Sequence, residues 1–398
     1  MSSRPTKLPA AEVAKLESHG LRGGLAEALD DPDQDSFVKS ELAVLKFHGI
    51  YQQENRDERA ERRAAGLGKR FTYMIRVAIP GGAMTAEQYL ALDALATAHS
   101  DGSVRLTTRQ AVQFHGTRMD GLRPTLQTIH ESLLTTFAAC GDVRRNVMAC
   151  TAPLPGGARV ELQRTAEAIA TELEPRTGAY HEIWLDGEKQ SFDTTSEAEE
   201  PFYGKEYLPR KFKIGLATED DNCVDAYTQD CALVAIVRDD AIVGYNLLAG
   251  GGFGMTHNRP DTFARIASPI GFVPPDRALD AVRVVASIFR DHGNRADRRH
   301  ARLKYLIESW GVERFRAEVK RRVEWHLAEP RPLRTPHQHD HLGEHEQAGG
   351  GRFYGLWVEN GRLKERQRDG VRAIVERFRP GVRITSMQNL LFTDLDAA

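Results

Sequence analysis

The chain has 398 residues, enough for two or three domains with buried cores. Its 54 lysines and arginines nearly balance 56 aspartates and glutamates, and a net charge of −2 excludes a global positive field for nucleic acid or acidic membranes. No run approaches the roughly 18 consecutive apolar residues of a membrane helix, and the amino-terminal residues lack the apolar segment of a secretory signal. The four cysteines show no C-x-x-C or C-x-x-x-C spacing, and four in so long a chain do not make a disulfide framework, which favours a cytoplasmic protein.

Residues 1–70 are predicted to form an amino-terminal arm and a helical extension. The first 35 residues are polar and become acidic towards their end, which favours a loosely ordered arm. The densely charged stretch 55–63 is helical by composition.

Residues 71–150 are predicted to form a ferredoxin-like half-domain. A strand over 71–80 ends at the turn signal Pro80-Gly81-Gly82, and Thr85 is expected to cap a helix over 86–100. A second strand is predicted over 103–116. The order strand, helix, strand is one split β-α-β unit.

The same order returns in residues 352–398, with a strand over 352–361, a helix over 370–381 and a strand over 382–392. We interpret this as an internal duplication and a second ferredoxin-like half-domain; two unrelated strands sharing R-x-T are the alternative. The alignment matches Val104 with Val382, Arg105 with Arg383, Thr107 with Thr385, Gln110 with Gln388, and Phe114 with Phe392.

Between the repeats, residues 151–330 are predicted to form an α/β domain. Its expected strands cover 181–185, 211–217, 232–237 and 243–249, and its expected helices cover 276–293, 299–310 and 313–325, with an acidic loop over 186–201. Residues 331–351 form a linker rich in histidine, proline and glycine.

The strand predicted over 103–116 carries a polar face. Alternate side chains of a strand share a face, so five polar side chains are expected to project together: Arg105, Thr107, Arg109, Gln113 and His115. Two guanidiniums in this set suit a planar ligand with several carboxylates. A solvent-exposed strand face is the alternative.

Four further stretches are candidates for binding. Lys211 and Lys213 share a face opposite Phe212, where an anion would relieve their repulsion, although an exposed basic edge is equally consistent. The glycines of 247–257 permit close backbone approach to a ligand but lack a dinucleotide fingerprint. A basic cluster is interpreted as a solvated face, with carboxylate recognition as the alternative; it consists of Arg295, Arg298, Arg299, Arg302 and Lys304. The histidines of 337–345 are also interpreted as solvated, with zinc binding as the alternative.

At this point the chain resembles the sirohaem-dependent sulfite and nitrite reductase family, and within it the haemoprotein (beta) subunits of sulfite reductases. The blocks that carry the resemblance run almost from end to end: LRGGLAEAL, RVAIPGG, RLTTRQAVQFHG, RRNVMAC, YLPRKFKIG, GYNLLAGGGFG and GNRADRRHARLKY. The resemblance implies an α+β fold in which duplicated ferredoxin-like half-domains flank an α/β domain that binds sirohaem.

The resemblance also implies roles for single residues. Those expected around the substrate side of the haem iron, as catalytic groups, are Arg76, Arg145, Lys211 and Lys213. Those expected to bind the cofactor are Arg105, Thr107, Arg109, Gln113, His115, Arg210, Gly251, Gly252, Lys304, Arg383 and Gln388. No residue is assigned as a metal ligand.

Sulfite is the expected substrate, because nitrite reductases of this family tend to carry Trp-Asn where this chain has Phe212-Lys213. A nitrite reductase and a non-catalytic sirohaem-binding fragment are the alternatives. In the family, paired cysteines after the second repeat bind a [4Fe–4S] cluster. All four cysteines here precede it, so we expect the third, cluster-bearing domain to be missing and turnover to require it. Electrons are expected from ferredoxin or a flavoprotein subunit.

Overall fold

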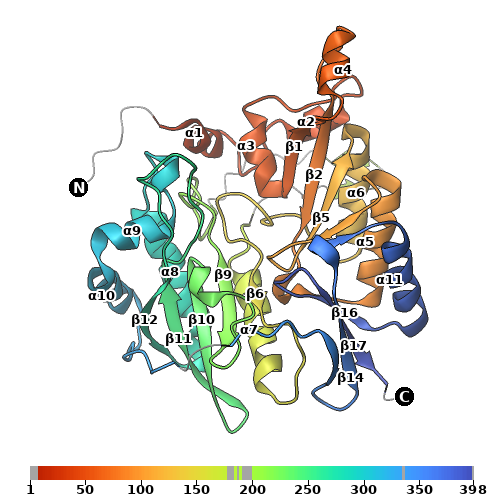
Figure 1. Cartoon of the computed structure of the whole chain (residues 1–398). Coiled ribbons are helices and arrows are strands. Elements are labelled where there is room, and N and C mark those ends of the chain that lie inside the picture. The colour runs from red at the N-terminus through yellow and green to blue at the C-terminus, as the bar shows by residue number, and fades with distance from the viewer. Residues whose placement is uncertain (1–7, 177–182, 186–187, 191–199, 334–336, 397–398) are drawn as a thin grey trace.

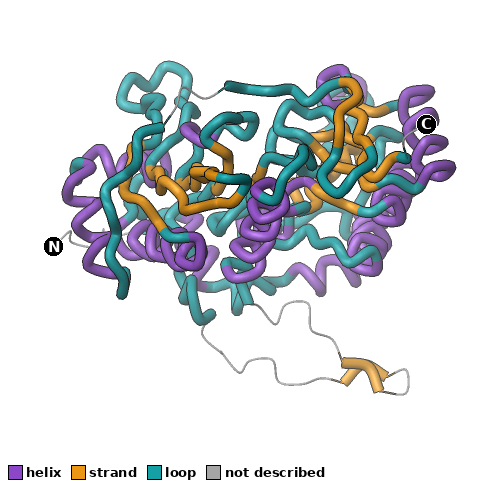
Figure 2. The backbone as a smooth tube through the Cα atoms, turned by 90° about the horizontal axis from the view of Figure 1, so that it is seen from below, coloured by secondary structure: helices purple, strands orange, loops and turns teal. Residues whose placement is uncertain are grey.

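The structure is a computed structural model that describes residues 8–176, 183–185, 188–190, 200–333 and 337–396. An α/β domain formed by the middle of the sequence, called the central domain below, lies beside the two paired sheets of the repeats (Figures 1 and 2). Among the described residues, no helix combines the length and apolar character needed to cross a bilayer.

The amino-terminal segment is folded, which corrects the expectation of a loosely ordered arm. Its elements are α1 (Ala10–Leu16), α2 (Leu25–Asp30), α3 (Glu41–Leu45), η1 (Lys46–His48), β1 (Ile50–Glu54) and α4 (Arg59–Ala64). The segment docks through buried Leu21 and Leu25, and the buried ammonium of Lys15 donates to the carbonyl oxygen of Leu208 at 2.9 Å. The polar composition did not predict this docking, because the charge of Lys15 is buried in an ion pair with Glu12 that only the folded structure shows. The helix expected over 55–63 is present in part as α4.

The first repeat contains β2 (Phe71–Val77), η2 (Pro80–Gly82), β3 (Ala83–Met84), α5 (Ala86–His99), β4 (Val104–Leu106), β5 (Val112–Thr117) and α6 (Met119–Glu131). Thr85 caps α5 as predicted, in a reciprocal capping box with Gln88. The single strand predicted over 103–116 is wrong. It is a hairpin of β4 and β5, because Gln110 adopts a left-handed conformation (φ 52°) and closes a turn.

The second repeat contains β13 (Gly343–Glu346), β14 (Arg352–Leu356), η7 (Glu359–Gly361), β15 (Arg362–Leu363), α11 (Glu365–Phe378), β16 (Gly381–Ile384) and β17 (Leu390–Leu395). The strand predicted over 382–392 is likewise a hairpin, with Gln388 left-handed (φ 65°) at the turn.

The two hairpins are built alike, which supports the predicted duplication. The Thr107 amide donates to the carbonyl of Ala111 at 2.9 Å, and the Thr385 amide donates to that of Asn389 at 2.9 Å. The sheet orders β1-β2-β5-β4-β15 and β13-β14-β17-β16-β3 also match position by position. Each half thus contributes one short strand to the sheet of the other half: β3 of the first pairs with β16 of the second, and β15 of the second pairs with β4 of the first.

Glycines make this strand exchange possible. A Cβ at Gly82 (φ 73°) would lie 2.5 Å from the carbonyl oxygen of Ile384, and one at Gly361 (φ 63°) would lie 2.7 Å from that of Leu106. Both glycines therefore stand where backbones of the two halves meet, in conformations that side chains disfavour.

The central domain carries a sheet in the order β12-β11-β10-β9-β6, in which β9 runs parallel to both neighbours. Its elements are β6 (Met148–Ala149), α7 (Ala158–Glu172), β9 (Ile214–Thr218), η4 (Ala226–Thr228), β10 (Cys231–Arg238), β11 (Ala241–Ala249), β12 (Ser268–Val273), η5 (Pro275–Arg277), α8 (Ala278–His292), η6 (Arg298–His300), α9 (Leu303–Trp310) and α10 (Val312–Arg322). A separate pair, β7 (Ile183–Leu185) and β8 (Glu188–Gln190), forms a small ribbon.

The predicted strands and helices of this domain are largely present, whereas β12 and α7 were not predicted. Most of the acidic loop expected over 186–201 lies outside the described residues. The α+β class, with duplicated ferredoxin-like halves beside an α/β domain, is confirmed. The domain boundaries remain predictions.

Candidate functional site

Two chain segments that meet at the start of β9 bring the predicted catalytic cations together. The amide of Phe212 donates to the carbonyl of Val143 at 3.0 Å, and the amide of Arg145 donates to the carbonyl of Phe212 at 2.7 Å. Phe212 is fully buried and stacks on Phe289. Lys211 and Lys213 flank it and project to the other side, where the charge of Arg145 acts on Lys211 and that of Arg109 acts on Lys213.

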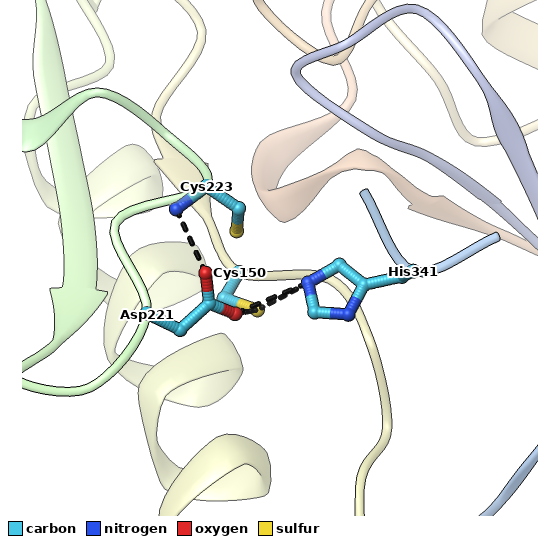
Figure 3. A group of neighbouring side chains, drawn as sticks. All are labelled: Cys150, Asp221, Cys223 and His341. Carbon is cyan, nitrogen blue, oxygen red and sulfur yellow. Dashed lines mark hydrogen bonds and ion pairs between the residues drawn. The ribbon is translucent and has the colours of Figure 1, made fainter. Parts of the chain in front are cut away.

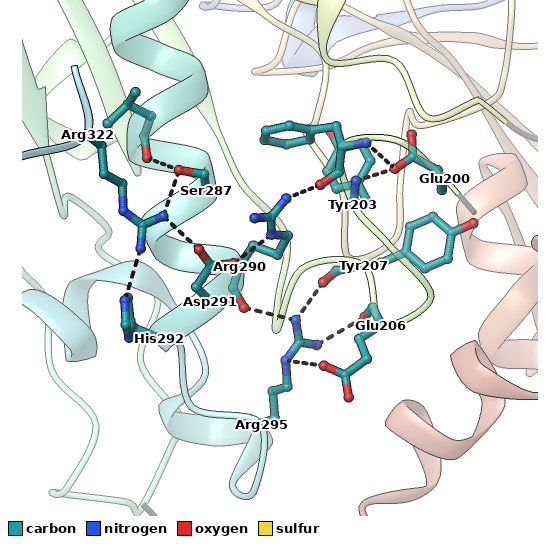
Figure 4. A network of polar contacts seen from close by, with 12 residues as sticks. Glu200, Tyr203, Glu206, Tyr207, Ser287, Arg290, Asp291, His292, Arg295 and Arg322 are labelled. Atoms are coloured by element: carbon teal, nitrogen blue, oxygen red, sulfur yellow. Dashed lines mark hydrogen bonds and ion pairs between the residues drawn. The ribbon is translucent and has the colours of Figure 1, made fainter. Parts of the chain in front are cut away.

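A polar network fixes the segment that leads into these lysines (Figure 4). Arg295 donates to the carbonyl oxygens of Glu206 at 3.0 Å and Tyr207 at 2.6 Å, and Arg290 of α8 donates to that of Phe202. Arg295 is thus a half-buried residue that holds this backbone in place. The interpretation of the basic cluster as a solvated face is wrong for this residue.

Crowding of positive charge perturbs both lysines. Burial, followed by the neighbouring guanidiniums of Arg145 and Arg302, lowers the pKa of Lys211 to about 8. Burial, then Arg109 and Arg302, lowers the pKa of Lys213 to about 7. Such values arise where like charges converge without enough anions to balance them, and they make both ammonium groups ready proton donors near neutral pH.

Arg76 of β2 lies opposite Gln113 of β5, and Gln113 lies opposite Arg105 of β4. One guanidinium nitrogen of Arg76 donates to the Cys140 sulfur at 3.0 Å; with the Gln113 amide turned so that its oxygen faces Arg76, that oxygen accepts from Nε at 2.9 Å. Burial and the Arg105 charge lower the pKa of His115 to about 4, so its imidazole is neutral. Arg105, Gln113, His115 and Arg76 therefore share one polar face.

Arg109 reaches this region from the β4–β5 turn and not from a strand face. It donates to the Gln229 side chain at 2.8 Å and to the carbonyls of Asn146 at 2.6 Å and Ile214 at 3.1 Å. Burial, then the charge of Arg145, lowers its pKa to about 9. Its Nε and that of Arg105 are buried without a hydrogen-bond partner among the described residues. Both nitrogens are available to an anionic ligand.

The glycine loop after β11 borders the same cations. A Cβ at Gly252 would lie 3.0 Å from a terminal nitrogen of Arg302, and Gly251 lies beside it in the loop. Lys304 donates to the carbonyls of Gly252 at 3.1 Å and Gly254 at 2.9 Å, and to that of Phe263. All three of its donors hold the loop in shape, so Lys304 positions backbone here.

Other predicted cofactor residues lie where the half-domains meet. Arg383 donates to the Thr151 carbonyl at 2.8 Å, Gln388 donates to the Leu106 carbonyl at 2.8 Å, and the Thr107 hydroxyl accepts turn amides. Arg210 lies 3.9 Å from Asp142. The roles assigned to the predicted site residues remain predictions.

Sequence reasoning missed two contributors to the site. Asp230, fully buried, accepts from Nε of Arg302 at 2.9 Å and from the Lys213 amide at 2.9 Å, and so fixes the Arg302 side chain and the backbone of Lys213. No local pattern marks it. Tyr51 of β1 lies near Arg76, Arg145 and Cys140; burial and the neighbouring Cys140 raise its pKa.

The linker histidines were all interpreted as solvated, and this is wrong for His341. It is only 5% exposed and lies 3.1 Å from the buried carboxylate of Asp221. The cause is long-range: the linker lies against the loop between β9 and β10, where the amide of Asn222 donates to the carbonyl of His337 at 2.7 Å.

Comparisons with known proteins agree with this architecture. A family model described as the nitrite and sulphite reductase 4Fe-4S domain matches residues 165–327, and one described as the nitrite/sulfite reductase ferredoxin-like half domain matches 67–132 and 345–398. The "sulfite reductase [NADPH] hemoprotein beta-component" of Staphylococcus saprophyticus is 42% identical over 98% of this chain and 69% of its own length. The protein of the same name from Myxococcus xanthus is 40% identical over 98% and 70%.

Among solved structures, the Mycobacterium tuberculosis NirA protein superposes with a TM-score of 0.75 at 23% identity, covering 98% of this chain and 67% of that one, and it supports the fold. The matched half domains coincide with the two repeats seen here, and the relatives match nearly every described element. The chain therefore belongs to the nitrite and sulphite reductase family.

Proposed function

We propose that the chain takes part in the six-electron reduction of sulfite to sulfide at sirohaem, bound across the face of β2, β4 and β5 and the start of β9. The observation that carries the proposal is the convergence of Lys211 and Lys213 on arginine side chains, with Arg302 acting on both and both lysine pKa values lowered towards neutrality. The name shared by the relatives, sulfite reductase hemoprotein, supports sulfite as the substrate.

The donor set fits a tetrapyrrole with several carboxylates. Arg105 and Arg109 each keep a buried Nε with no partner among the described residues, and a forked guanidinium matches a carboxylate. His115, held neutral, can donate one hydrogen bond and accept another. When bound, the haem iron would supply the coordination site and the electrons for reduction.

The residues of the chain would bind the substrate and deliver protons. Arg76 and Arg145 would donate to the oxygens of the sulfite anion, and this stabilises negative charge that builds up as electrons arrive. Lys211 and Lys213 would pass protons from Nζ to a departing oxygen, which leaves as water once it has received two of them. A lysine with a pKa of about 7 gives up a proton readily and regains it from solvent at neutral pH.

The cysteines do not fit a [4Fe–4S] cluster, which needs four thiolates around one centre. Cys140 lies beside Arg76, Cys231 lies in β10, and Cys150 and Cys223 share their surroundings with a carboxylate and an imidazole. We propose that the cluster which delivers electrons takes its ligands from other residues than these, and that ferredoxin or a flavoprotein subunit reduces it. The cysteines, all free and buried, favour a reducing compartment such as the cytoplasm.

The test is anion binding to the chain after co-expression with sirohaem synthesis. Sulfite should shift the haem absorption bands at lower concentration than nitrite does. Lys213→Asn should weaken sulfite binding at least tenfold more than nitrite binding, whereas Lys39→Asn, at an exposed lysine, should change neither. Tighter nitrite binding by the wild type would favour nitrite reduction. Equal loss of both anions would refute the role of Lys213 in choosing sulfite.

A further inference from the structure

Four side chains that can ligate a metal meet in the interior (Figure 3). None of them belongs to the proposed sulfite site. They are Cys150 at the end of β6, Asp221 and Cys223 in the loop between β9 and β10, and His341 in the linker. Their ligand atoms lie within 4.8 Å of one another, and none of the four is more than 6% exposed. Three segments distant in sequence thus converge on one point.

The distances match a tetrahedral ion. Zinc bonds of about 2.3 Å to sulfur and about 2.1 Å to nitrogen or oxygen give tetrahedral edges of about 3.6 Å between sulfur and nitrogen or oxygen, and about 3.4 Å between nitrogen and oxygen. The Cys150 sulfur lies 3.4 Å from Asp221 Oδ2 and 3.6 Å from His341 Nε2, and those two atoms are 3.1 Å apart. These three edges thus lie within about 0.3 Å of the tetrahedral values, and the Cys223 sulfur lies within 4.8 Å of all three atoms.

Surrounding groups orient the ligands. The second carboxylate oxygen of Asp221 accepts from the amide of Cys223 at 3.0 Å and from that of His339 at 3.4 Å, which leaves Oδ2 facing the centre. Arg159 donates to Asp221 Oδ2 at 3.1 Å and to the Cys150 sulfur. Donors of this kind hold ligands in place around structural metal ions.

The electrostatics favour a cation. A dication would bind both cysteines as thiolates and His341 as a neutral imidazole. With two thiolates, one carboxylate and the Arg159 guanidinium, the buried charges would then sum to zero.

We propose that Cys150, Asp221, Cys223 and His341 bind a zinc ion that fastens the linker to the central domain. Two thiolates, one imidazole and one carboxylate form a donor set that zinc favours. The ion would also brace the second repeat, because Ser386 donates to the Cys223 carbonyl and Arg383 donates to that of Thr151, next to Cys150. The site is distinct from the proposed sulfite site and does not depend on it.

The test is the metal content of the untagged full chain, measured together with iron and acid-labile sulfide. We expect equimolar zinc in the wild type and less than a tenth of that in Cys223→Ser and His341→Ala. His339→Ala, an exposed histidine two residues away, and Cys231→Ser, a buried cysteine of β10, should keep their zinc. Loss of zinc in His339→Ala or Cys231→Ser, or its retention in Cys223→Ser, would overturn the assignment.

A second measurement needs no variant and remains informative if the variants fail to fold. X-ray absorption at the zinc edge of the wild type should show two sulfur and two lighter neighbours. Cobalt in place of zinc should give intense tetrahedral bands with thiolate charge transfer. A folded chain that takes up neither metal would show a metal-free ionic network around Arg159. Equimolar sulfide with iron at these cysteines would instead identify an iron–sulfur site, and either result would refute the proposal.

Discussion

The positive charge of Lys213 is expected to lower the free energy of unfolding of the anion-free protein. Its ammonium is partly buried among the positive charges of Arg109, Arg302 and Lys211, and the main opposing charge is the carboxylate of Asp230. Lys213→Met keeps the length and apolar stem of the side chain and removes the charge. In the absence of a bound anion, we expect this variant to be more stable than the wild type, although it should bind sulfite poorly.

The magnitude follows from the pKa of Lys213, which falls from 10.5 to about 7 on folding. This difference corresponds to about 5 kcal/mol of unfavourable interaction for the charged form. Because the side chain is not fully buried, solvent screening reduces that figure, and we expect a gain of about 2 kcal/mol at pH 7. The unfolded chain binds more protons than the folded one between pH 7 and pH 10.5, so wild-type stability rises across this window. The advantage of the variant should shrink accordingly.

The assay is urea unfolding of the anion-free proteins at pH 6.5, 8 and 9.5, repeated with sulfate, whose charge is constant over this range. Sulfate should stabilise the wild type, most strongly at the lowest pH, and should stabilise Lys213→Met less. Lys39→Met, at an exposed lysine, is the matched control and should behave as the wild type. A variant that is less stable than the wild type, or whose advantage is the same at all three pH values, would refute the reasoning.

Two further predictions concern the strand exchange and the anchor of the cations. Gly82→Ala and Gly361→Ala should each lower the free energy of unfolding by about 3 kcal/mol in urea titrations, because the added Cβ meets a backbone carbonyl at positive φ. Gly370→Ala is the control, because this glycine lies in a helix with open space around it; the substitution should raise the free energy of unfolding by about 0.5–1 kcal/mol. A comparable decrease in the free energy of unfolding for all three variants would contradict the argument. Asp230→Asn should lower thermal stability and weaken sirohaem retention at least tenfold by visible absorbance, because it leaves Arg302 buried without its counter-charge. Retention equal to the wild type would show that Asp230 does not organise the site.

Much of the fold could be predicted because its signals are local. The capping box at Thr85 and the periodicity of the following helix depend on neighbouring residues alone. The duplication was visible because equivalent turns need equivalent residues: Thr107 and Thr385 close the two hairpins in the same way, and Gln110 and Gln388 adopt the same left-handed conformation.

The exchange of strands between the repeats could not be predicted. β3 and β15 are two residues long, and a pattern of alternation cannot be recognised over so short a stretch. The hairpin turns were missed for a related reason, because Gln110 carries no sequence signal for positive φ. As a result Arg109 was assigned to a strand face, whereas it reaches the site from a turn.

The candidate site was only partly visible in the sequence. Arginines and lysines in clusters point to an anion, but the residue that fixes them, Asp230, lies in an ordinary pattern and is identified by its contacts. The group around Cys150 depends on the path of the linker, which brings His341 to Asp221 across 120 positions of the chain. Only tertiary structure joins such residues.

The most direct measurement is the visible spectrum of the purified chain after co-expression with sirohaem synthesis. Binding across the β2–β5 face predicts equimolar tetrapyrrole in the wild type and in Lys39→Met, and at least a tenfold loss in Arg109→Met, whose buried Nε would bind a carboxylate. A folded wild-type chain that retains no tetrapyrrole, or an Arg109→Met variant that retains it in full, would contradict the account.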